Sequence, residues 1–166
     1  MNLFSVTPQE VFSVTEQDLA FVSKWNEFFL GLQTTEPDSI LALLHPEVIA
    51  AEVDTPSITI RYPVAHWMRN PINNVHGGIL CTMADSAAGA LSGILSRGKV
   101  GSPTISLTMN YLRPVPTDSS AVIVRATCDK AGRTVNFLSV EAWREGQEGK
   151  LCFTATANFF VRQPTA

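Results

Sequence analysis

The sequence predicts an α+β fold, with a largely antiparallel sheet packed against one long apolar helix. An apolar stretch of helical length runs through residues 77–95, and strand-like segments lie on both sides of it. The connections between the later segments are short and turn-forming, over residues 114–119, 129–132 and 145–149. Such links join antiparallel neighbours, because parallel strands need a crossover of a dozen or more residues.

The N-terminal part of the chain predicts a helix over residues 16–32. Thr15 is a suitable N-cap, and the acidic residues Glu16 and Asp18 favour the positive end of the helix dipole. Apolar side chains recur at helical spacing, at Phe21, Trp25, Phe28 and Leu32. We expect the aromatic side chains to cover an edge or a face of the main fold.

A second, short helix is expected over residues 37–44. Pro37 is tolerated in a first turn, and Pro46 blocks continuation of the helix. No glycine- or serine-rich linker follows. We therefore expect residues 1–47 to form a helical extension that packs on a main domain of residues 48–166.

The main domain contains six segments with the apolar and polar alternation, or the β-branched content, that is typical of strands. They are residues 48–54, 57–64, 104–112, 120–128, 134–143 and 150–161. The segment 104–112 alternates most regularly. One of its faces is predicted to hold Ile105, Leu107, Met109 and Tyr111, and the other Ser106, Thr108 and Asn110.

The apolar helix has two faces of different character. Its core stripe is predicted to comprise Leu80, Ala84, Ala87, Leu91, Ile94 and Leu95. A second face carries small or polar side chains, namely Thr82, Asp85, Gly89, Ser92 and Gly93. No Lys, Arg or Glu occurs between Gly77 and Ser96, although a solvent-exposed helix face is usually rich in them. We therefore expect the second face to contact protein or a ligand.

Asp85 is the one charged residue of this helix. A carboxylate in an apolar environment is costly unless it is paired, hydrogen-bonded or functional. It is either a functional acid or base, or a partly exposed acid bonded to a neighbouring group. The residues alone do not favour the first reading over the second.

The start of the helix is a candidate anion site. Gly77 and Gly78 let a ligand approach backbone N–H groups that have no acceptor within the helix, where the dipole also favours negative charge. The alternative is that His76-Gly77-Gly78 is only a tight turn, which a lone Gly-Gly pair would favour. Asp85, about two turns further on, strengthens the reading as an oxyanion site.

Composition excludes several classes of function. The 166 residues suit one domain, and a net charge of −3 without a basic cluster argues against a nucleic-acid partner. Only 16% of the residues are charged, against about 25% in an average soluble protein, so we expect a partner subunit to hide part of the surface. The three cysteines and three histidines match no disulfide framework or metal motif, so no metal is implied.

The N-terminal segment MNLFSVTPQEVF has neither the basic flank nor the uninterrupted apolar region of a signal peptide. The apolar helix contains Asp85 and is rich in Ala and Gly, which fits a buried helix better than a membrane span. We therefore expect a soluble, cytoplasmic protein without membrane contact.

Residues 70–85 resemble the motif of hotdog-fold acyl-CoA thioesterases of the phenylacetate-pathway (PaaI-like) type. Asn70 lies six residues before His76, and Asp85 lies nine residues after it. The resemblance continues through Ser102-Pro103-Thr104-Ile105-Ser106, through MNYLRP at 109–114 and through Gly132-Arg133. It covers the chain from about residue 50 onward and leaves residues 1–47 unexplained.

The resemblance implies a curved antiparallel sheet wrapped around one long central helix. It also implies a homodimer, often paired into a dimer of dimers, with active sites at the subunit interface. Asp85 of one subunit would act as general base or nucleophile toward the thioester of an acyl-CoA. The backbone N–H of Gly77 or Gly78 of the other subunit would polarise the thioester carbonyl. Asn70 and Ser106 match positions that orient the attacking water or the acid.

This chemistry requires an activated water and a stabilised oxyanion, so a metal is unnecessary and coenzyme A enters only as part of the substrate. His76 would bond the substrate or hold the loop, and we favour the supporting role. Trp67 and Met68 would line the acyl pocket or pack in the core. Cys81 as a nucleophile with His76 is rejected, because a small residue in an apolar helix more often packs.

Four basic residues could contact the phosphates of coenzyme A, although surface charges are usually only solvated. They are Arg133, Arg113, Arg97 and Lys99. The leading hypothesis is hydrolysis of a small or medium acyl-CoA, with aromatic acyl groups included. The alternatives are a hotdog dehydratase or hydratase, and a non-catalytic acyl-CoA-binding protein.

Overall fold

A six-stranded antiparallel sheet forms the body of the protein in the computed structural model, which describes residues 16–96 and 102–161. Its strands are β1 (Glu47–Glu52), β2 (Ser57–Pro63), β3 (Thr104–Tyr111), β4 (Ala121–Lys130), β5 (Val135–Arg144) and β6 (Leu151–Phe160). Their order is β1-β2-β4-β5-β6-β3, and all neighbours are antiparallel. Each predicted strand is confirmed, with bounds within two residues of those expected.

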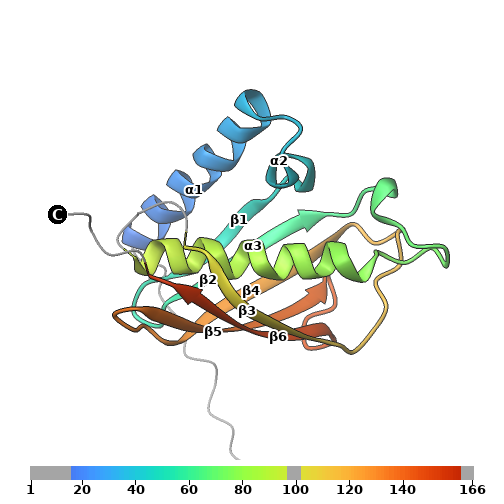
Figure 1. Ribbon diagram of the computed structural model, residues 1–166. Helices are drawn as coiled ribbons and strands as arrows, with labels where there is room; N and C mark the ends of the chain where they lie inside the picture. The colour runs from blue at the N-terminus through green and yellow to red at the C-terminus, as the bar shows by residue number, and fades with distance from the viewer. Residues whose placement is uncertain (1–15, 97–101, 162–166) are drawn as a thin grey trace, which may run out of the picture.

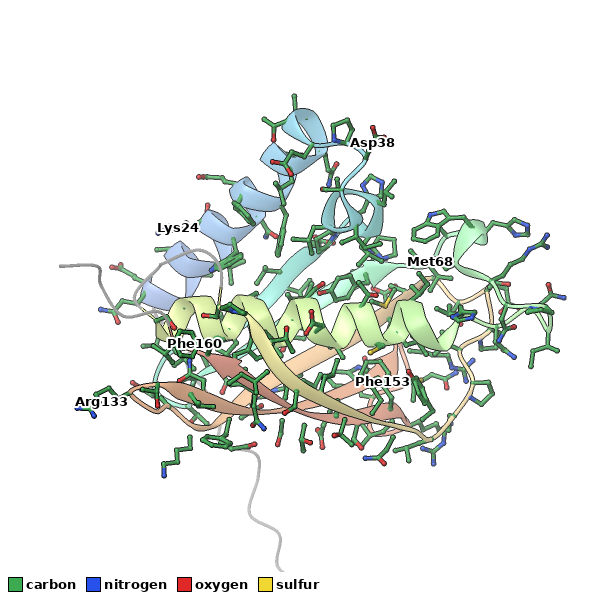
Figure 2. The ribbon with its side chains drawn as sticks, in the orientation of Figure 1. Lys24, Asp38, Met68, Arg133, Phe153 and Phe160 are labelled. Carbon is green, nitrogen blue, oxygen red and sulfur yellow. The ribbon has the colours of Figure 1, made fainter. Side chains whose placement is uncertain are left out.

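Helix α3 (Gly77–Leu95) lies across the concave face of this sheet, as Figure 1 shows. Phe153 of β6 is buried beneath it (Figure 2). The predicted core stripe is largely confirmed, since its first four residues are buried and the last two, Ile94 and Leu95, are partly buried. The α+β fold, with a curved antiparallel sheet around a long central helix, is therefore confirmed.

Among the described helices, only α3 is long and apolar enough to span a membrane by length and composition. Half of that stretch is buried inside the fold. Its apolar character is explained by its packing on the sheet, because a helix at the centre of a domain must bury most of its surface.

Two helices precede the sheet and lie above α3 in Figure 1. The first, α1 (Glu16–Thr35), is longer than predicted, and its last turn includes a bond from the Thr35 hydroxyl to the Gly31 carbonyl (3.1 Å). The second, α2 (Ile40–Leu44), begins later than predicted because Ser39 is its N-cap and accepts from the Ala42 N–H. The predicted cap Thr15 lies outside the described residues.

The aromatic side of α1 packs on the main fold, as expected. Phe29 is buried in the core, and Val22, Trp25 and Leu32 pack against it. The rings of Trp25, Phe28 and Phe29 contact one another, with centroids 5.4–5.6 Å apart. The side chain of Phe21 lies outside what the structure describes.

The two edges of the sheet are protected differently. Along β1, the Asn26 side chain of α1 accepts from the Val48 N–H (2.7 Å) and donates to the Val48 carbonyl (2.9 Å), so it takes the place of a neighbouring strand. In the described part of the chain, β3 pairs with β6 alone, and most of its residues are exposed. An open edge strand is a template for pairing with another chain.

Candidate active site

A cavity of about 390 Å³ lies between the two N-terminal helices and α3, and we call it the α1–α3 cavity. One wall comes from α1 and α2, through Trp25, Phe28, Phe29, Ile40 and Leu41. The opposite wall comes from α3, through Thr82, Asp85, Ser86, Gly89, Ala90 and Gly93. Ser102, Thr104 and Phe159 complete it. The second face of α3, predicted to meet protein or a ligand, therefore faces this cavity.

Asp85 is partly buried in the wall of this cavity and is held by a hydrogen bond from β3. The Thr104 hydroxyl donates to Asp85 Oδ1 at 2.8 Å. No basic side chain pairs with this carboxylate in the part of the chain that the structure describes. The acid is thus oriented by a neutral donor and keeps its negative charge available to a ligand.

Thr104 was not among the predicted site residues, because the resemblance assigned the orienting hydroxyl to Ser106. A β-bulge explains the difference. The register of β3 on β6 shifts between Thr104, which faces Phe159, and Ser106, which faces Asn158. Neighbouring residues of a strand point to opposite faces of the sheet. Thr104 therefore shares the α3 side with the cavity-lining Phe159.

Ser106 lies on the other side of the sheet, where its hydroxyl accepts from the Asn158 amide at 2.9 Å. The structure thus does not bring Ser106 to Asp85 within one subunit. The bulge also changes the predicted apolar face, because Ile105 is 55% exposed whereas Leu107 and Met109 pack against the core.

Ser92 was predicted on the face of α3 that meets a ligand. Its hydroxyl instead accepts a hydrogen bond from the buried Asn136 side chain at 3.1 Å.

The start of α3 is fixed by His76. Its Nδ1 atom accepts from the Gly78 N–H at 3.0 Å, so the side chain is the N-cap of the helix and the Gly78 amide is already paired. For the Gly77 N–H, the described residues supply no acceptor. The Gly77 carbonyl accepts from the Tyr111 hydroxyl at 2.8 Å, which ties the helix start to β3. Gly77 therefore keeps the free donor at this terminus.

Asn70 closes the loop that leads into α3. Its Oδ1 atom accepts from the N–H groups of Ile72 (3.0 Å) and Asn74 (3.1 Å), and its own N–H donates to the Asn74 carbonyl (2.7 Å). The side-chain NH₂ group of Asn70 has no acceptor among the residues described. Asn70 thus holds the loop with its oxygen and leaves its nitrogen for a ligand or a water molecule.

Trp67 and Met68 lie in a short 3-10 helix, η1 (His66–Met68), and have different environments. Met68 is fully buried in the core, where its sulfur accepts from the Ala65 N–H at 3.5 Å. Trp67 is exposed. Neither residue lines the α1–α3 cavity. Of the two predicted roles, Met68 therefore has the packing role.

Of the basic residues predicted to bind coenzyme A, the two that the structure describes, Arg113 and Arg133, lie apart. Arg113 is exposed and donates to the Leu151 carbonyl (2.8 Å) at the start of β6. Arg133 lies before β5, whose first residue pairs with Phe160 at the end of β6, and Figure 2 shows it at the opposite end of the sheet from Met68. Arg97 and Lys99 lie outside the described residues. Arg113 and Arg133 are therefore near opposite ends of β6.

Asp85 also acts on two neighbouring groups. The pKa of the Cys81 thiol and the pKa of the Tyr62 hydroxyl are both raised. The larger cause is burial, and the second cause is the negative charge of Asp85. A raised pKa keeps Cys81 in the unreactive thiol form at neutral pH, which agrees with its rejection as a nucleophile. The Tyr62 hydroxyl is buried without a hydrogen-bond partner in the described structure.

The arrangement of the cavity suits two kinds of chemistry on an apolar ligand. The carboxylate can accept a proton from water, or it can attack the ligand as a nucleophile. The cavity is lined mainly by apolar atoms, and its charged group is a single carboxylate with a fixed orientation. In residues 16–96 and 102–161, no three His, Cys, Asp or Glu side chains cluster closely enough to hold a metal ion. A carboxylate of this kind can accept a proton from water or attack an electrophilic carbon.

Comparison with known proteins gives a consistent result. Residues 72–150 match the thioesterase superfamily. A phenylacetic acid degradation-related protein of Ralstonia eutropha JMP134 is 26% identical, with a TM-score of 0.67 over 81% of this chain and 99% of that one. Zebrafish thioesterase superfamily member 2 has a TM-score of 0.72 at 18% identity, over 85% of this chain and 98% of that one.

A variant of the phenylacetic acid degradation protein PaaI of Thermus thermophilus has a TM-score of 0.63 at 23% identity. This alignment covers 75% of the present chain and 100% of the Thermus chain. No curated protein matches the sequence significantly.

Proposed function

We propose that this chain, which has the hotdog fold and matches the thioesterase superfamily over residues 72–150, is a PaaI-like thioester hydrolase that converts an acyl-CoA to a free acid and coenzyme A. The observation that carries this proposal is the position of Asp85, which is held by Thr104 in the wall of a mainly apolar cavity. The cavity suits the acyl group, and the carboxylate suits the thioester at its entrance.

Asp85 starts the reaction in one of two ways. As a general base it takes a proton from water, and the hydroxide adds to the thioester carbon. As a nucleophile it adds to that carbon itself, and water then hydrolyses the resulting anhydride. In both routes the carbon–sulfur bond breaks and the thiolate of coenzyme A leaves and takes up a proton. Turnover in H₂¹⁸O tests the nucleophilic route, because ¹⁸O enters the Asp85 carboxylate only when an anhydride forms and water attacks its aspartyl carbonyl.

The oxyanion that forms on the carbonyl oxygen needs a hydrogen-bond donor. We assign this role to the Gly77 N–H, because the Gly78 N–H is paired with His76. Gly77 and Asp85 are eight residues apart on α3, which is about 12 Å along the helix. Both groups must lie about 3 Å from adjacent atoms of one thioester. One subunit therefore cannot supply both, and we propose that Gly77 acts on the substrate beside Asp85 of a second copy.

We propose that the two copies pair through the open edge of β3, which would join their sheets into one. This would also explain why a chain with few charged residues leaves large apolar side chains such as Ile105 and Leu112 exposed. Asn70 would orient a water molecule or the thioester through its free NH₂ group, and His76 would support Gly78. Arg113, Arg133 and Trp67 remain proposed contacts for coenzyme A at the rim.

The oligomer is tested by Ile105→Lys, which places a charge in the β-bulge of β3. Ile49→Lys is the matched control, because Ile49 is exposed to a similar degree (46% against 55%) and lies at the bulge of the opposite edge strand, β1. Sedimentation velocity should show a dimer, or a dimer of dimers, for the wild type and the control. Ile105→Lys should shift the protein to monomers and lose activity. Monomers in the wild type would contradict the shared site.

The reaction is tested by release of free thiol from a panel of acyl-CoAs, from acetyl-CoA to dodecanoyl-CoA and including phenylacetyl-CoA. We expect hydrolysis of at least the medium-length members. Conversion of an enoyl-CoA without release of thiol would favour the dehydratase or hydratase alternative. We also propose that the protein acts in the cytoplasm, where its three free cysteines would remain reduced.

A further inference from the structure

The N-terminal helices contribute apolar side chains to the cavity that contains Asp85, although the sequence motif shared with PaaI-like thioesterases begins only at about residue 50. Phe28 and Ile40 are 39% and 46% exposed, yet both line the α1–α3 cavity. Phe28 also packs on Trp25 and Phe29, so these rings form a rigid apolar surface opposite α3. Exposed apolar side chains that surround a carboxylate are typical of a ligand pocket.

The cavity is longer on one side of Asp85 than on the other. Along α3 its lining begins at Thr82, three residues before Asp85, and ends at Gly93, eight residues after it. At 1.5 Å per residue, the longer limb extends about 12 Å from the carboxylate. An apolar group that reacts beside Asp85 therefore has its longest free path toward Gly93.

Gly93 marks the end of this limb and faces open space. A Cβ atom built on Gly93 would meet no atom of the described residues within 4 Å, whereas one on Gly89 would lie 3.3 Å from the Phe159 ring. Glycine in a helix interior is less favourable than a residue with a side chain. A larger residue would fit the fold at Gly93, so the empty space there calls for an explanation other than packing.

We propose that α1 and α2 roof an acyl-binding chamber whose length is set by Gly93, and that this chamber selects medium-chain acyl groups. This inference rests on the proposed thioesterase function and specifies its substrate. An extended chain advances roughly 1.2 Å per bond, so a 12 Å limb holds roughly ten bonds. The volume agrees, because 390 Å³ accommodates roughly a dozen groups of the size of water or methylene, at about 30 Å³ each.

The direct test is Gly93→Leu, which fills the far end of the limb. Gly31→Leu is the matched control, because Gly31 is an exposed glycine of α1 that likewise has no atom within 4 Å of a built Cβ and does not line the cavity. The leucine would displace about three methylene groups, and burial of each is worth about fourfold in binding. We therefore expect kcat/KM for decanoyl-CoA to fall at least tenfold, with butanoyl-CoA changed less than threefold.

The roof is tested by Phe28→Ala, which removes one ring of the opposite wall and should raise the ratio of dodecanoyl-CoA to decanoyl-CoA hydrolysis. If Gly93→Leu leaves the ratio of decanoyl-CoA to butanoyl-CoA unchanged, or if Gly31→Leu lowers it equally, the chamber is not where we place it. The melting temperature of each variant shows whether a loss of activity is caused only by unfolding of the protein.

Failure of the proposed function can be recognised separately. S-decyl-CoA and S-butyl-CoA are thioethers that cannot be hydrolysed, and calorimetry measures their binding whether or not the protein is a hydrolase. One result is that no acyl-CoA is hydrolysed, but Gly93→Leu still weakens the binding of S-decyl-CoA at least tenfold and that of S-butyl-CoA little. The proposed function is then wrong, and the proposed chamber is supported. If hydrolysis occurs but both ligands bind Gly93→Leu and the wild type with equal affinity, the proposed chamber is wrong and the proposed function is supported.

Discussion

Replacing Thr104 by valine removes the hydroxyl that donates to Asp85 and keeps a side chain of nearly the same shape. The bond it removes is 2.8 Å long and ends on a carboxylate oxygen. A hydrogen bond to a charged group is worth about 1.5–3 kcal/mol. Because Thr104 is exposed and water can replace part of the bond, we expect the lower end of this range.

A loss of about 1.5 kcal/mol in orientation of the catalytic carboxylate corresponds to slightly more than a tenfold decrease, about 13-fold, in kcat. Stability should change by no more than about 0.5 kcal/mol, as for most exposed positions. Thr104→Ser restores the hydroxyl and should recover most of the activity. The combination of Thr104→Val with Asp85→Asn should be no slower than Asp85→Asn alone, because the hydroxyl acts through the carboxylate.

The assay is the initial rate of thiol release, with KM and kcat determined separately for each variant. Ser139→Ala is the control, because the Ser139 hydroxyl makes an equivalent bond to the exposed Asp129 carboxylate (2.6 Å) away from the cavity. Full activity in Thr104→Val, or an equal loss in Ser139→Ala, would refute the view that the bulge of β3 positions Asp85.

Three further predictions concern the fold and the thiol. Asn26→Ala removes both bonds to Val48 and should lower the free energy of unfolding by about 1–3 kcal/mol in a urea titration. Tyr62→Phe removes a buried hydroxyl that has no partner in the described structure, so stability should stay the same or rise by up to about 1 kcal/mol. Cys81 should react slowly with iodoacetamide at neutral pH, because burial and Asp85 raise its pKa, and Asp85→Asn should accelerate this reaction.

A specific outcome would contradict each of these three predictions. A loss below about 0.5 kcal/mol for Asn26→Ala would mean that water replaces the side chain at the β1 edge. A clear loss for Tyr62→Phe would mean that the hydroxyl has a partner, such as a bound water molecule. Fast alkylation of Cys81 in the folded protein, measured by intact mass, would mean that the thiol is more ionised than its surroundings imply.

The sequence was sufficient to locate the strands and the core helix along the chain. Alternating apolar residues and short turns predict strands without knowledge of tertiary contacts, and all six were found near their expected positions. The core stripe of α3 was predicted for the same reason, because helical spacing alone decides which residues share a face. Boundaries were less accurate where a side-chain cap decides them, as Ser39 does for α2.

The site could be predicted only in part. Asp85 stands out because a charge in an apolar helix is unusual, and that signal is local. Thr104 could not be predicted from alternation, because the bulge at Ile105 reverses the period and moves Ser106 to the far side of the sheet. The resemblance did include Thr104 in its SPTIS segment, but the register needed to choose between the two hydroxyls depends on β6.

The contribution of the N-terminal helices to the cavity could not be predicted from the sequence either. Helical spacing predicted that Trp25 and Phe28 would face the main fold, but not which part of it. Their position opposite Asp85 depends on how α1 docks, to which Asn26 contributes through its two bonds to Val48. Such a contact joins residues that are 22 positions apart and leaves no periodic signal.

The most direct test of the account is the rate of thiol release from decanoyl-CoA by the wild type and by Asp85→Asn. Loss of a general base or nucleophile should lower kcat by about 10²–10⁴-fold, while the fold and the binding of S-decyl-CoA remain. Asp129→Asn, which changes an equivalent carboxylate away from the cavity, should keep full activity. Undiminished turnover by Asp85→Asn would contradict the central claim that this carboxylate attacks the thioester or activates the water that does.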